Sequence, residues 1–386
     1  MKILIATDTY SPQVNGVVTV LEEQIPKLAK VNEVVVIAPA KINEKMQIKK
    51  EGNITTYLIK GHNFPLYKEY IMAPFAKKQV RKIIEEEKPD LVHLHAPVML
   101  GISTLNEAVK KKIPTIITHH THFPDYIGET VGKSLPQVAK KLFRKVIEKK
   151  IKQEYNKANA IIVPSEALKK ELEELGILKV EVVENGVDLE KLSKVDQKSI
   201  DEFKEKFADN EKVSILLYLG RLSREKKIHI LIEAMNEVEN AKLLIVGSGP
   251  AAKELKEYSQ KLKLENKVVF CGFLKNKSVA YTNCDIFVSA SDTETFGLTF
   301  VEAMWFEKPA IGANKLGATQ IIKNNENGVL CIPNSPKDFS KAINGLLNDR
   351  ETYNKLAKNA KKTAEKYNIE NSLDKLIKIY KLQLLN

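Results

Sequence analysis

Short runs rich in isoleucine and valine recur along this chain between longer helical patterns. In the first half they occupy residues 2–7, 33–39, 91–95, 115–120 and 160–165. Continuous rather than alternating hydrophobicity is typical of strands that are buried on both faces, as in a parallel sheet with helical crossovers. The first half is therefore predicted to be a doubly wound α/β domain.

The same pattern begins again after a polar stretch at about 188–210. Its strand-like runs lie at 213–220, 242–249, 267–272, 285–291, 308–313 and 328–333, with helical segments such as 230–238 and 339–367 between them. Since 386 residues exceed what one core usually fills, we expect two Rossmann-like domains with parallel sheets that face each other across a cleft. We place them at 1–190 and 191–370, with a final helix at about 371–386 that packs back on the first.

The charge balance favours an anionic partner. With 61 basic and 49 acidic side chains the net charge is +12, which suits binding to a nucleotide, a nucleic acid or an acidic membrane surface. A chain rich in charged residues is also typical of a thermophilic source. No apolar run reaches the roughly 20 residues of a spanning helix, and the N-terminus lacks a signal-peptide layout. We therefore expect a cytoplasmic protein. Whether it also attaches peripherally to the inner face of the cell membrane stays open.

The segment GRLSREK, residues 220–226, follows a buried-strand pattern and presents two cations. Arg221 and Lys226 in a loop at a strand end suit a diphosphate, because guanidinium and ammonium groups neutralise separate oxygens. A solvated basic turn is the alternative. GSGP at 247–250 is an incomplete dinucleotide-binding pattern, which counts against an NAD-dependent dehydrogenase.

The segment SDTETFGLTFVEAM, residues 291–304, leads from a strand into a helix that is predicted to start near Phe296 and Gly297. The free N–H groups at this start, those of Gly297, Leu298 and Thr299, form an anion site. Glu302 suits ribose hydroxyls and Glu294 suits hydroxyls of a sugar beyond the phosphates. As mere helix-capping acids, these glutamates would contribute about 0.5–1 kcal/mol.

Several motifs together resemble the retaining glycosyltransferases of family four, which have the GT-B architecture. They are the E-x7-E pair, GRLSREK, VENGVD (183–188), TDTYSPQVNGVVTV (7–20), PDLVHLHAPVMLG (89–101) and THHTHFPDY (118–126), and they span nearly the whole chain. The resemblance implies transfer of a hexose from a UDP- or GDP-sugar to an acceptor hydroxyl, without a metal or other cofactor. It also implies donor-binding residues: Gly16, Arg221, Lys226, Gly272, Phe273, Leu274, Glu294, Phe296, Gly297, Leu298, Thr299 and Glu302.

THHTHFPDY is similar to a segment of family members that glycosylate diacylglycerol or phosphoinositol lipids. The resemblance implies a lipid acceptor, and it implies that His120 hydrogen-bonds the transferred sugar near the reacting carbon. With Arg221, Lys226 and Glu294, His120 would carry the reaction. His119 and His122 point elsewhere by alternation, and no carboxylate with ligand spacing supports a metal site here.

A basic amphipathic helix is predicted at 136–157. Leu142 and Val146 lie on its apolar half, while Lys141, Lys145 and Lys149 lie on the other. Two interpretations stay open: docking on an anionic membrane surface, or an ordinary domain helix with a solvated lysine face.

Some positions depart from the family pattern. Glu307 replaces a glycine before the next strand, Gln320 stands where glutamate is common, and Ala318 replaces the second glycine of a Gly-Gly pair. Rival functions are transfer to a soluble sugar or sugar phosphate, a nucleotide-sugar 2-epimerase, and a non-catalytic basic protein that binds membrane or nucleic acid. Low aromatic content, 7%, and the lack of an RNA-binding motif count against nucleic acid. The sugar, the base and the oligomeric state stay open.

Overall fold

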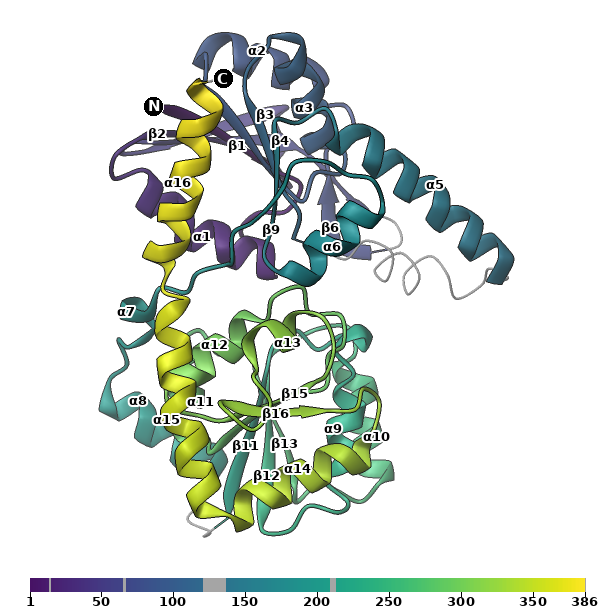
Figure 1. The fold of residues 1–386 in the computed structure, drawn as a ribbon, viewed down its shortest axis with the longest axis vertical. Coiled ribbons are helices and arrows are strands. Elements are labelled where there is room, and N and C mark those ends of the chain that lie inside the picture. Colours follow the sequence, from purple (N-terminus) through teal and green to yellow (C-terminus); the bar gives the residue numbers. More distant parts are fainter. Residues whose placement is uncertain (14, 65–66, 121–136, 209–212, 386) are drawn as a thin grey trace. The chain divides into compact units, whose positions relative to one another are not determined.

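The computed structural model describes residues 1–13, 15–64, 67–120, 137–208 and 213–385. The chain divides into two compact units, which are drawn in Figure 1. The first unit contains Met1–Asn185 and Ile369–Asn386, and the second contains Gly186–Asn368.

The first unit is built on an eight-stranded sheet with the order β10-β9-β8-β7-β1-β2-β4-β3. All neighbours are parallel except β3 and β4, and a separate hairpin pairs β5 with β6. The bounds are β1 Lys2–Thr7, β2 Glu33–Ala40, β3 Met46–Glu51, β4 Ile54–Lys60, β5 His62–Phe64, β6 Tyr67–Met72, β7 Leu91–His95, β8 Thr115–Thr118, β9 Ala160–Val163 and β10 Val180–Val182. The five expected strands are confirmed. The edge strand β3 was missed because five of its six residues are exposed and four of these are polar.

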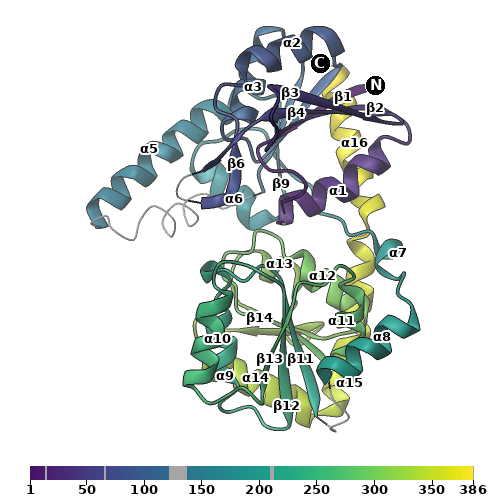
Figure 2. The same cartoon turned by 180° about the vertical axis from the view of Figure 1, so that it is seen from behind.

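Helices cover both faces of this sheet. They are α1 Gly16–Leu28, α2 Lys77–Glu87, α3 Leu100–Lys110, α5 Gln137–Tyr155, α6 Glu166–Glu174 and α16 Ile369–Leu385. The views in Figures 1 and 2 show α16 beside α1, and both helices bury side chains in the same core cluster. Ion pairs Lys27–Glu370, at 2.7 Å, and Lys375–Glu184, at 2.6 Å, add to this packing. The C-terminal helix is thus part of the first unit.

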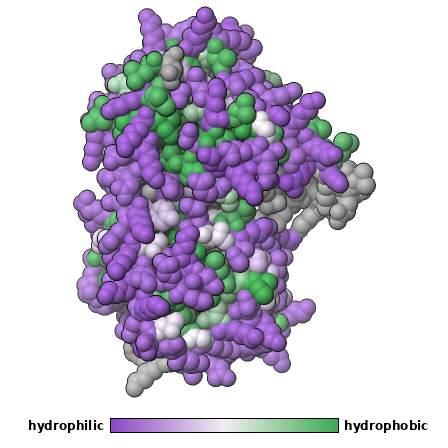
Figure 3. All heavy atoms as spheres, in the orientation of Figure 1, coloured by the Kyte–Doolittle hydropathy of each residue, from purple (hydrophilic) through white to green (hydrophobic). Residues whose placement is uncertain are grey.

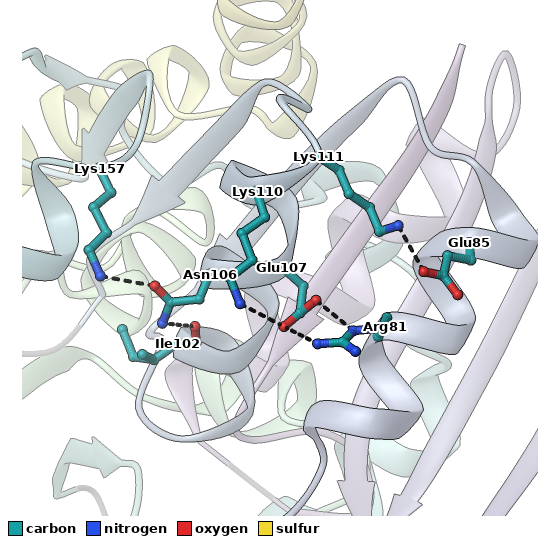
Figure 4. A network of polar contacts seen from close by, with 8 residues as sticks. All are labelled: Arg81, Glu85, Ile102, Asn106, Glu107, Lys110, Lys111 and Lys157. Carbon is teal, nitrogen blue, oxygen red and sulfur yellow. Dashed lines mark hydrogen bonds and ion pairs between the residues drawn. The ribbon is translucent and has the colours of Figure 1, made fainter.

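On the opposite face, α2 and α3 are joined by the polar network in Figure 4. Glu107 is buried on α3, and its carboxylate accepts a hydrogen bond from Arg81 Nε at 3.0 Å and pairs with Lys110 at 3.3 Å. The Arg81 hydrogen bond is the largest effect that lowers the pKa of Glu107. A buried carboxylate that has lost its water needs such partners to stay charged.

The second unit has a fully parallel six-stranded sheet with the order β13-β12-β11-β14-β15-β16. The strands are β11 Ser214–Leu219, β12 Ala241–Val246, β13 Val268–Gly272, β14 Ile286–Ser289, β15 Ala310–Ala313 and β16 Gly328–Cys331. All six expected strands are confirmed. Two core clusters lie on the two faces of this sheet, which is why its strands are hydrophobic at successive positions.

The helices of the second unit are α7 Leu189–Leu192, α8 Gln197–Phe203, α9 Ile228–Ala234, α10 Ala252–Lys261, α11 Ser278–Asn283, α12 Leu298–Trp305, α13 Gly317–Ile321, α14 Pro336–Asn348 and α15 Arg350–Lys366. The second unit also has a π-helical turn at Lys204–Ala208 and a 3-10 turn at Arg224–Lys226. The helical run expected at 339–367 is two helices. They separate at Asp349, whose side chain accepts a hydrogen bond from Thr352 N at 3.0 Å and caps α15.

The face of the molecule in Figure 3 is mostly hydrophilic, in line with the 28% of residues that are charged. Within the part of the chain that the structure describes, no helix combines the length and the apolar character that a membrane span requires.

The helix α12 ends in a Schellman motif whose glycine position is occupied by Glu307. The N–H of Glu307 donates to Met304 O and that of Lys308 donates to Ala303 O, at 3.0 and 3.1 Å, and Glu307 has φ 58°. A residue with a Cβ is disfavoured in this left-handed conformation, which explains why the family pattern has glycine there.

Replacing Glu307 by glycine should therefore stabilise the protein. We expect Glu307→Gly to raise the free energy of unfolding by about 0.5–1 kcal/mol, measured by urea denaturation. Glu307→Ala removes the carboxylate but keeps the Cβ, and it serves as the control. Equal stabilities of the two variants would contradict this account of the helix end.

Two histidines of β7 lie inside the first unit. His93 and His95 are each 1% exposed. Burial is the main cause that lowers the pKa of His93 to about 3 and the pKa of His95 well below its usual value. Both rings are neutral in the folded protein at neutral pH.

The first unit should consequently lose stability in mild acid. Below about pH 6.5 the unfolded chain takes up protons on these histidines, whereas folded His93 does not bind one until about pH 3 and the pKa of folded His95 is also well below its usual value. Each such histidine therefore costs up to about 1.4 kcal/mol per pH unit as the pH falls below about 6.5. Amide hydrogen exchange would measure the opening free energies of β7 and β11 at pH 7.5 and 5.5. The strand β11 is the control, because the only histidine of the second unit is the exposed His229. The prediction fails if the opening free energies of the two strands fall equally.

Candidate active site

Sheet order brings the two main motifs of the second unit together. β11 and β14 are parallel neighbours, so the loops that follow them leave the same edge of the sheet. The first loop carries Arg221 and Lys226, and the second carries Glu294. Lys226 Nζ lies 2.6 Å from Glu294 Oε1, and both side chains are about one-fifth exposed. The structure therefore brings these two predicted residues together.

A second ion pair beside the first was not predicted from the sequence. Lys227 Nζ lies 2.7 Å from Asp292 Oδ2 and 2.7 Å from Asn334 Oδ1, and Lys315 approaches Asp292 at 3.5 Å. Consecutive lysines thus pair with acids two residues apart. Nothing in the local sequence distinguished Asp292 from an ordinary turn residue.

Glycines hold the cationic loop by close backbone contact. A Cβ at Gly247, where φ is 141°, would collide with Gly220 O, and one at Gly249 would collide with Leu222 O. The N–H of Leu222 donates to Ser248 O, and the N–H of Ala251 donates to Leu222 O, both at 2.9 Å. GSGP therefore acts as a backbone brace for the loop that carries Arg221.

Arg221 itself is half-buried. Burial lowers the pKa of its guanidinium, although an arginine side chain stays protonated at any ordinary pH. Its backbone carbonyl accepts a hydrogen bond from Tyr218 Oη at 3.0 Å, which ties the loop to the strand before it.

Gly297 is the N-cap of α12 and has φ 96°. A Cβ here would lie 2.6 Å from Phe300 Cδ2, so both the backbone conformation and the space require glycine. Leu298 and Thr299 form the first turn, whose N–H groups have no acceptor within the helix. The preceding Phe296 is buried and packs edge-on against Tyr367.

Glu302 lies in the second turn of α12 and is only 1% exposed. Its Oε1 pairs with Lys277 Nζ, and its Oε2 accepts a hydrogen bond from Tyr281 Oη at 2.7 Å. Neither partner was identified from the sequence. Of the two partners, Lys277 is the more exposed, with 32% of its side chain accessible.

At the edge of the sheet, Gly272 ends β13 with φ 75°. The next residue, Phe273, is 60% exposed, and Leu274 is partly buried against the core. An exposed ring beside a strand end is suited to stack on a nucleotide base. The contact predicted between this segment and the base stays a prediction.

Gly317, the first residue of α13, shows where the Gly-Gly departure lies. Its N–H donates to Glu294 O at 2.7 Å, and a Cβ there would lie 2.5 Å from Phe296 N. The replaced glycine was expected at Ala318, but Ala318 is inside α13, and Leu316 has φ 46° and ψ −128°. The expectation for Ala318 was wrong, because Leu316 occupies the conformation that favours glycine.

In the first unit, Gly16 begins α1 after the N-cap Asn15, whose side chain accepts from Val18 N at 3.1 Å. A Cβ at Gly16 would meet nothing within 4 Å. Packing therefore gives no reason for a glycine there, and the predicted approach of phosphates stays untested.

The start of α3 is already occupied by an anion of the chain itself. Asp8, just beyond β1, accepts hydrogen bonds from the N–H groups of residues 98–101 at 2.7–3.1 Å. Burial raises the pKa of the Asp8 carboxyl, and the four N–H donors act in the opposite direction. This helix start therefore serves to fix the loop after β7.

His120 is buried at the end of the segment after β8. Its ring stacks on His95, with Nε2 2.8 Å from His95 Nδ1. His119 turns to a different partner, since its Nδ1 lies 3.0 Å from Tyr155 Oη. His122 lies outside the described residues. Among the described side chains, no three His, Cys, Asp or Glu residues are grouped so that they could hold a metal ion.

The predicted basic helix is α5, at Gln137–Tyr155. Its C-terminal part is anchored by Ile151 and Tyr155, which pack on the core. Toward the N-terminal end of the helix, Leu142 and Val146 are 65% and 59% exposed, and Lys141, Lys145 and Lys149 are exposed as well. Figures 1 and 2 show this part of α5 extending beyond the sheet.

Comparison with solved structures shows a shared fold. HepE from Anabaena, solved in complex with UDP, is 20% identical with a TM-score of 0.77, and the match covers 99% of this chain and all of that chain. Sucrose-phosphate synthase from Thermosynechococcus elongatus is 19% identical with a TM-score of 0.78, and 99% of each chain is covered.

Comparison of sequences gives nearer relatives. Alpha-monoglucosyldiacylglycerol synthases are 29% identical, over 86% of this chain and 75% of the Streptococcus pneumoniae protein, and over 95% of this chain and 93% of the Acholeplasma laidlawii protein. A sulfoquinovosyl transferase of Arabidopsis thaliana is 27% identical over 78% of this chain and 58% of its own length.

Family models match both halves of the sequence. Residues 14–191 match Glycosyltransferase Family 4, and residues 199–363 match the group 1 glycosyl transferases. The chain therefore belongs to the family-four glycosyltransferases with the GT-B fold and is homologous to glycolipid synthases.

Proposed function

We propose that this protein transfers a hexose from a UDP- or GDP-sugar to a hydroxyl of a membrane lipid, with retention of configuration and without a metal. The observation that carries the proposal is the pair of strand-end loops in which Lys226 and Glu294 meet beside the α12 start. Similarity to two diacylglycerol-modifying synthases supports a lipid acceptor.

The second unit supplies the charges that a nucleoside diphosphate needs. Arg221, Lys226 and the N–H groups at the α12 start would neutralise the two phosphates, and Glu302 would accept hydrogen bonds from the ribose once Lys277 has moved. A lysine ammonium has three N–H donors, so Lys226 can contact a phosphate while it stays paired with Glu294.

In the reaction, the bond between the sugar C1 and the phosphate oxygen breaks, and its electron pair goes to the leaving diphosphate. The acceptor oxygen forms the new bond to C1 from the same face, and its proton passes to the leaving phosphate. Preorganised cations and N–H dipoles stabilise the charge that develops. Glu294 and His120 would hold the sugar hydroxyls while positive charge builds at C1.

Removing the loop cations or Glu294 should slow transfer far more than it affects folding. We expect Arg221→Ala, Lys226→Ala and Glu294→Gln each to lower turnover by about a hundredfold or more. Radiolabelled sugar transferred from UDP- and GDP-sugars to diacylglycerol in vesicles would measure this.

Arg224→Ala is the matched control. Arg224 lies in the same loop, but it is exposed and pairs with Glu254 at 2.8 Å, so we expect turnover near that of the wild type. Near-wild-type transfer by Lys226→Ala would refute the assignment. Transfer to soluble sugars alone would replace the lipid acceptor, and donor turnover without any acceptor would favour an epimerase.

We also propose that α5 docks on anionic membrane. Its exposed Leu142 and Val146 can enter the interface while the neighbouring lysines contact acidic headgroups.

Charge reversal tests this docking. Changing Lys141, Lys145 and Lys149 together to glutamate should lower binding to vesicles of phosphatidylglycerol and phosphatidylcholine by about a hundredfold, since each lysine contributes about 1 kcal/mol and reversal adds repulsion. Reversal of Lys355, Lys358 and Lys362, three exposed lysines on α15, is the control. Equal loss in both triple variants, measured by vesicle co-sedimentation, would show a general charge effect and no docking by α5.

A further inference from the structure

Two lysine–acid pairs join the loops that follow β11 and β14, and their surroundings differ. In one pair, Lys227 Nζ lies 2.7 Å from Asp292 Oδ2 and also 2.7 Å from Asn334 Oδ1. Lys315 approaches the same carboxylate at 3.5 Å, and the Asp292 side chain is only 8% exposed. Lys227 and Asp292 thus each have a second partner, and together they anchor one loop to the other.

The other pair is more open to water. Lys226 Nζ lies 2.6 Å from Glu294 Oε1, and the two side chains are 23% and 21% exposed. Water that reaches both charges weakens their attraction, so such a pair can loosen at small cost. The anchor between Lys227 and Asp292 would meanwhile keep the two loops in place.

A diphosphate that binds the loop cations needs the ammonium group that Glu294 already neutralises. Lysine has three N–H donors, so Lys226 can contact a phosphate oxygen and Glu294 together. Its single positive charge is then shared between two anions, and the carboxylate also repels the phosphate. A sugar hydroxyl that donates to Glu294 would replace the lysine as its partner. The carboxylate therefore favours a nucleotide that still carries its sugar.

We propose that Glu294 and the diphosphate compete for Lys226, so that Glu294 lowers the affinity for the nucleoside diphosphate product and promotes its release. This rests on the proposed function, in which the diphosphate contacts Lys226 and the sugar contacts Glu294. Before transfer, the sugar hydroxyls occupy the carboxylate. Once the sugar has left with the acceptor, Glu294 returns to Lys226 and weakens its contact with the product.

Equilibrium binding to Glu294→Gln tests the competition. Glutamine has nearly the same shape, and its Oε1 can still accept from Lys226, but it carries no charge. Calorimetric titrations with UDP, GDP and pyrophosphate should give dissociation constants about three- to tenfold lower than those of the wild type. Glu294→Ala, which removes the carboxylate outright, should show the same gain. A residue that only held the loop in shape would weaken binding when it is replaced.

Two controls separate competition from a general change of charge. Asp292→Asn makes the same change in net charge two residues away, and Lys227 keeps its contact with Asn334. At about 0.15 M salt this remoter charge is largely screened, so we expect a change of less than about twofold. In a Lys226→Ala background, Glu294→Gln should also gain less than about twofold, because the cation for which both anions compete is gone.

Unchanged or weaker binding by both Glu294 variants would overturn the inference. An equal gain in Asp292→Asn would show a general charge effect, and a gain that persists without Lys226 would show direct repulsion, so either result overturns it as well. Pyrophosphate separates the inference from the proposed function. If pyrophosphate follows the expected pattern but no sugar is transferred from any UDP- or GDP-sugar, the competition stands and the proposed reaction fails. If none of the three anions binds the wild type, both fail.

Discussion

The parallel pairing of β11 with β14 is the constraint on which the candidate site depends. It makes the loops after these strands leave one sheet edge, where Lys226 meets Glu294 and Lys227 meets Asp292. These pairs hold the two loops at a fixed separation. The same edge presents the start of α12, so cations and oriented N–H groups are in place before a ligand arrives.

Close backbone contacts make this arrangement rigid. Gly247 and Gly249 let one turn pack directly on the Arg221 loop, and Gly317 lets another pack on the backbone of Glu294 and Phe296. Side chains at these positions would push the loops apart. In the first unit the corresponding role belongs to buried polar groups: Asp8 fixes the start of α3, and buried contacts through His95 and His93 join His120 to Tyr380 of α16.

Much of this could be predicted from the sequence. Buried parallel strands are hydrophobic at most of their positions, on both faces, so all eleven expected strands were found. Strand-end placement predicted that Arg221, Lys226 and Glu294 belong to one site. Exposed or very short strands such as β3 and β10 carry no such signal. The partners of Glu302 lie 21 and 25 residues away and follow no local pattern. Backbone conformation was also hidden, which is why the strained residue proved to be Leu316 and not Ala318.

The central claim is that the second unit binds the diphosphate of a nucleotide sugar through the loop cations. Calorimetric titration of the ligand-free protein with UDP and with GDP tests it most directly. The account predicts that one of them binds, that affinity falls as salt rises, and that Lys226→Ala weakens binding about tenfold or more while Arg224→Ala does not. Equal affinities of the wild type and Lys226→Ala, or no binding of either nucleotide, would contradict it.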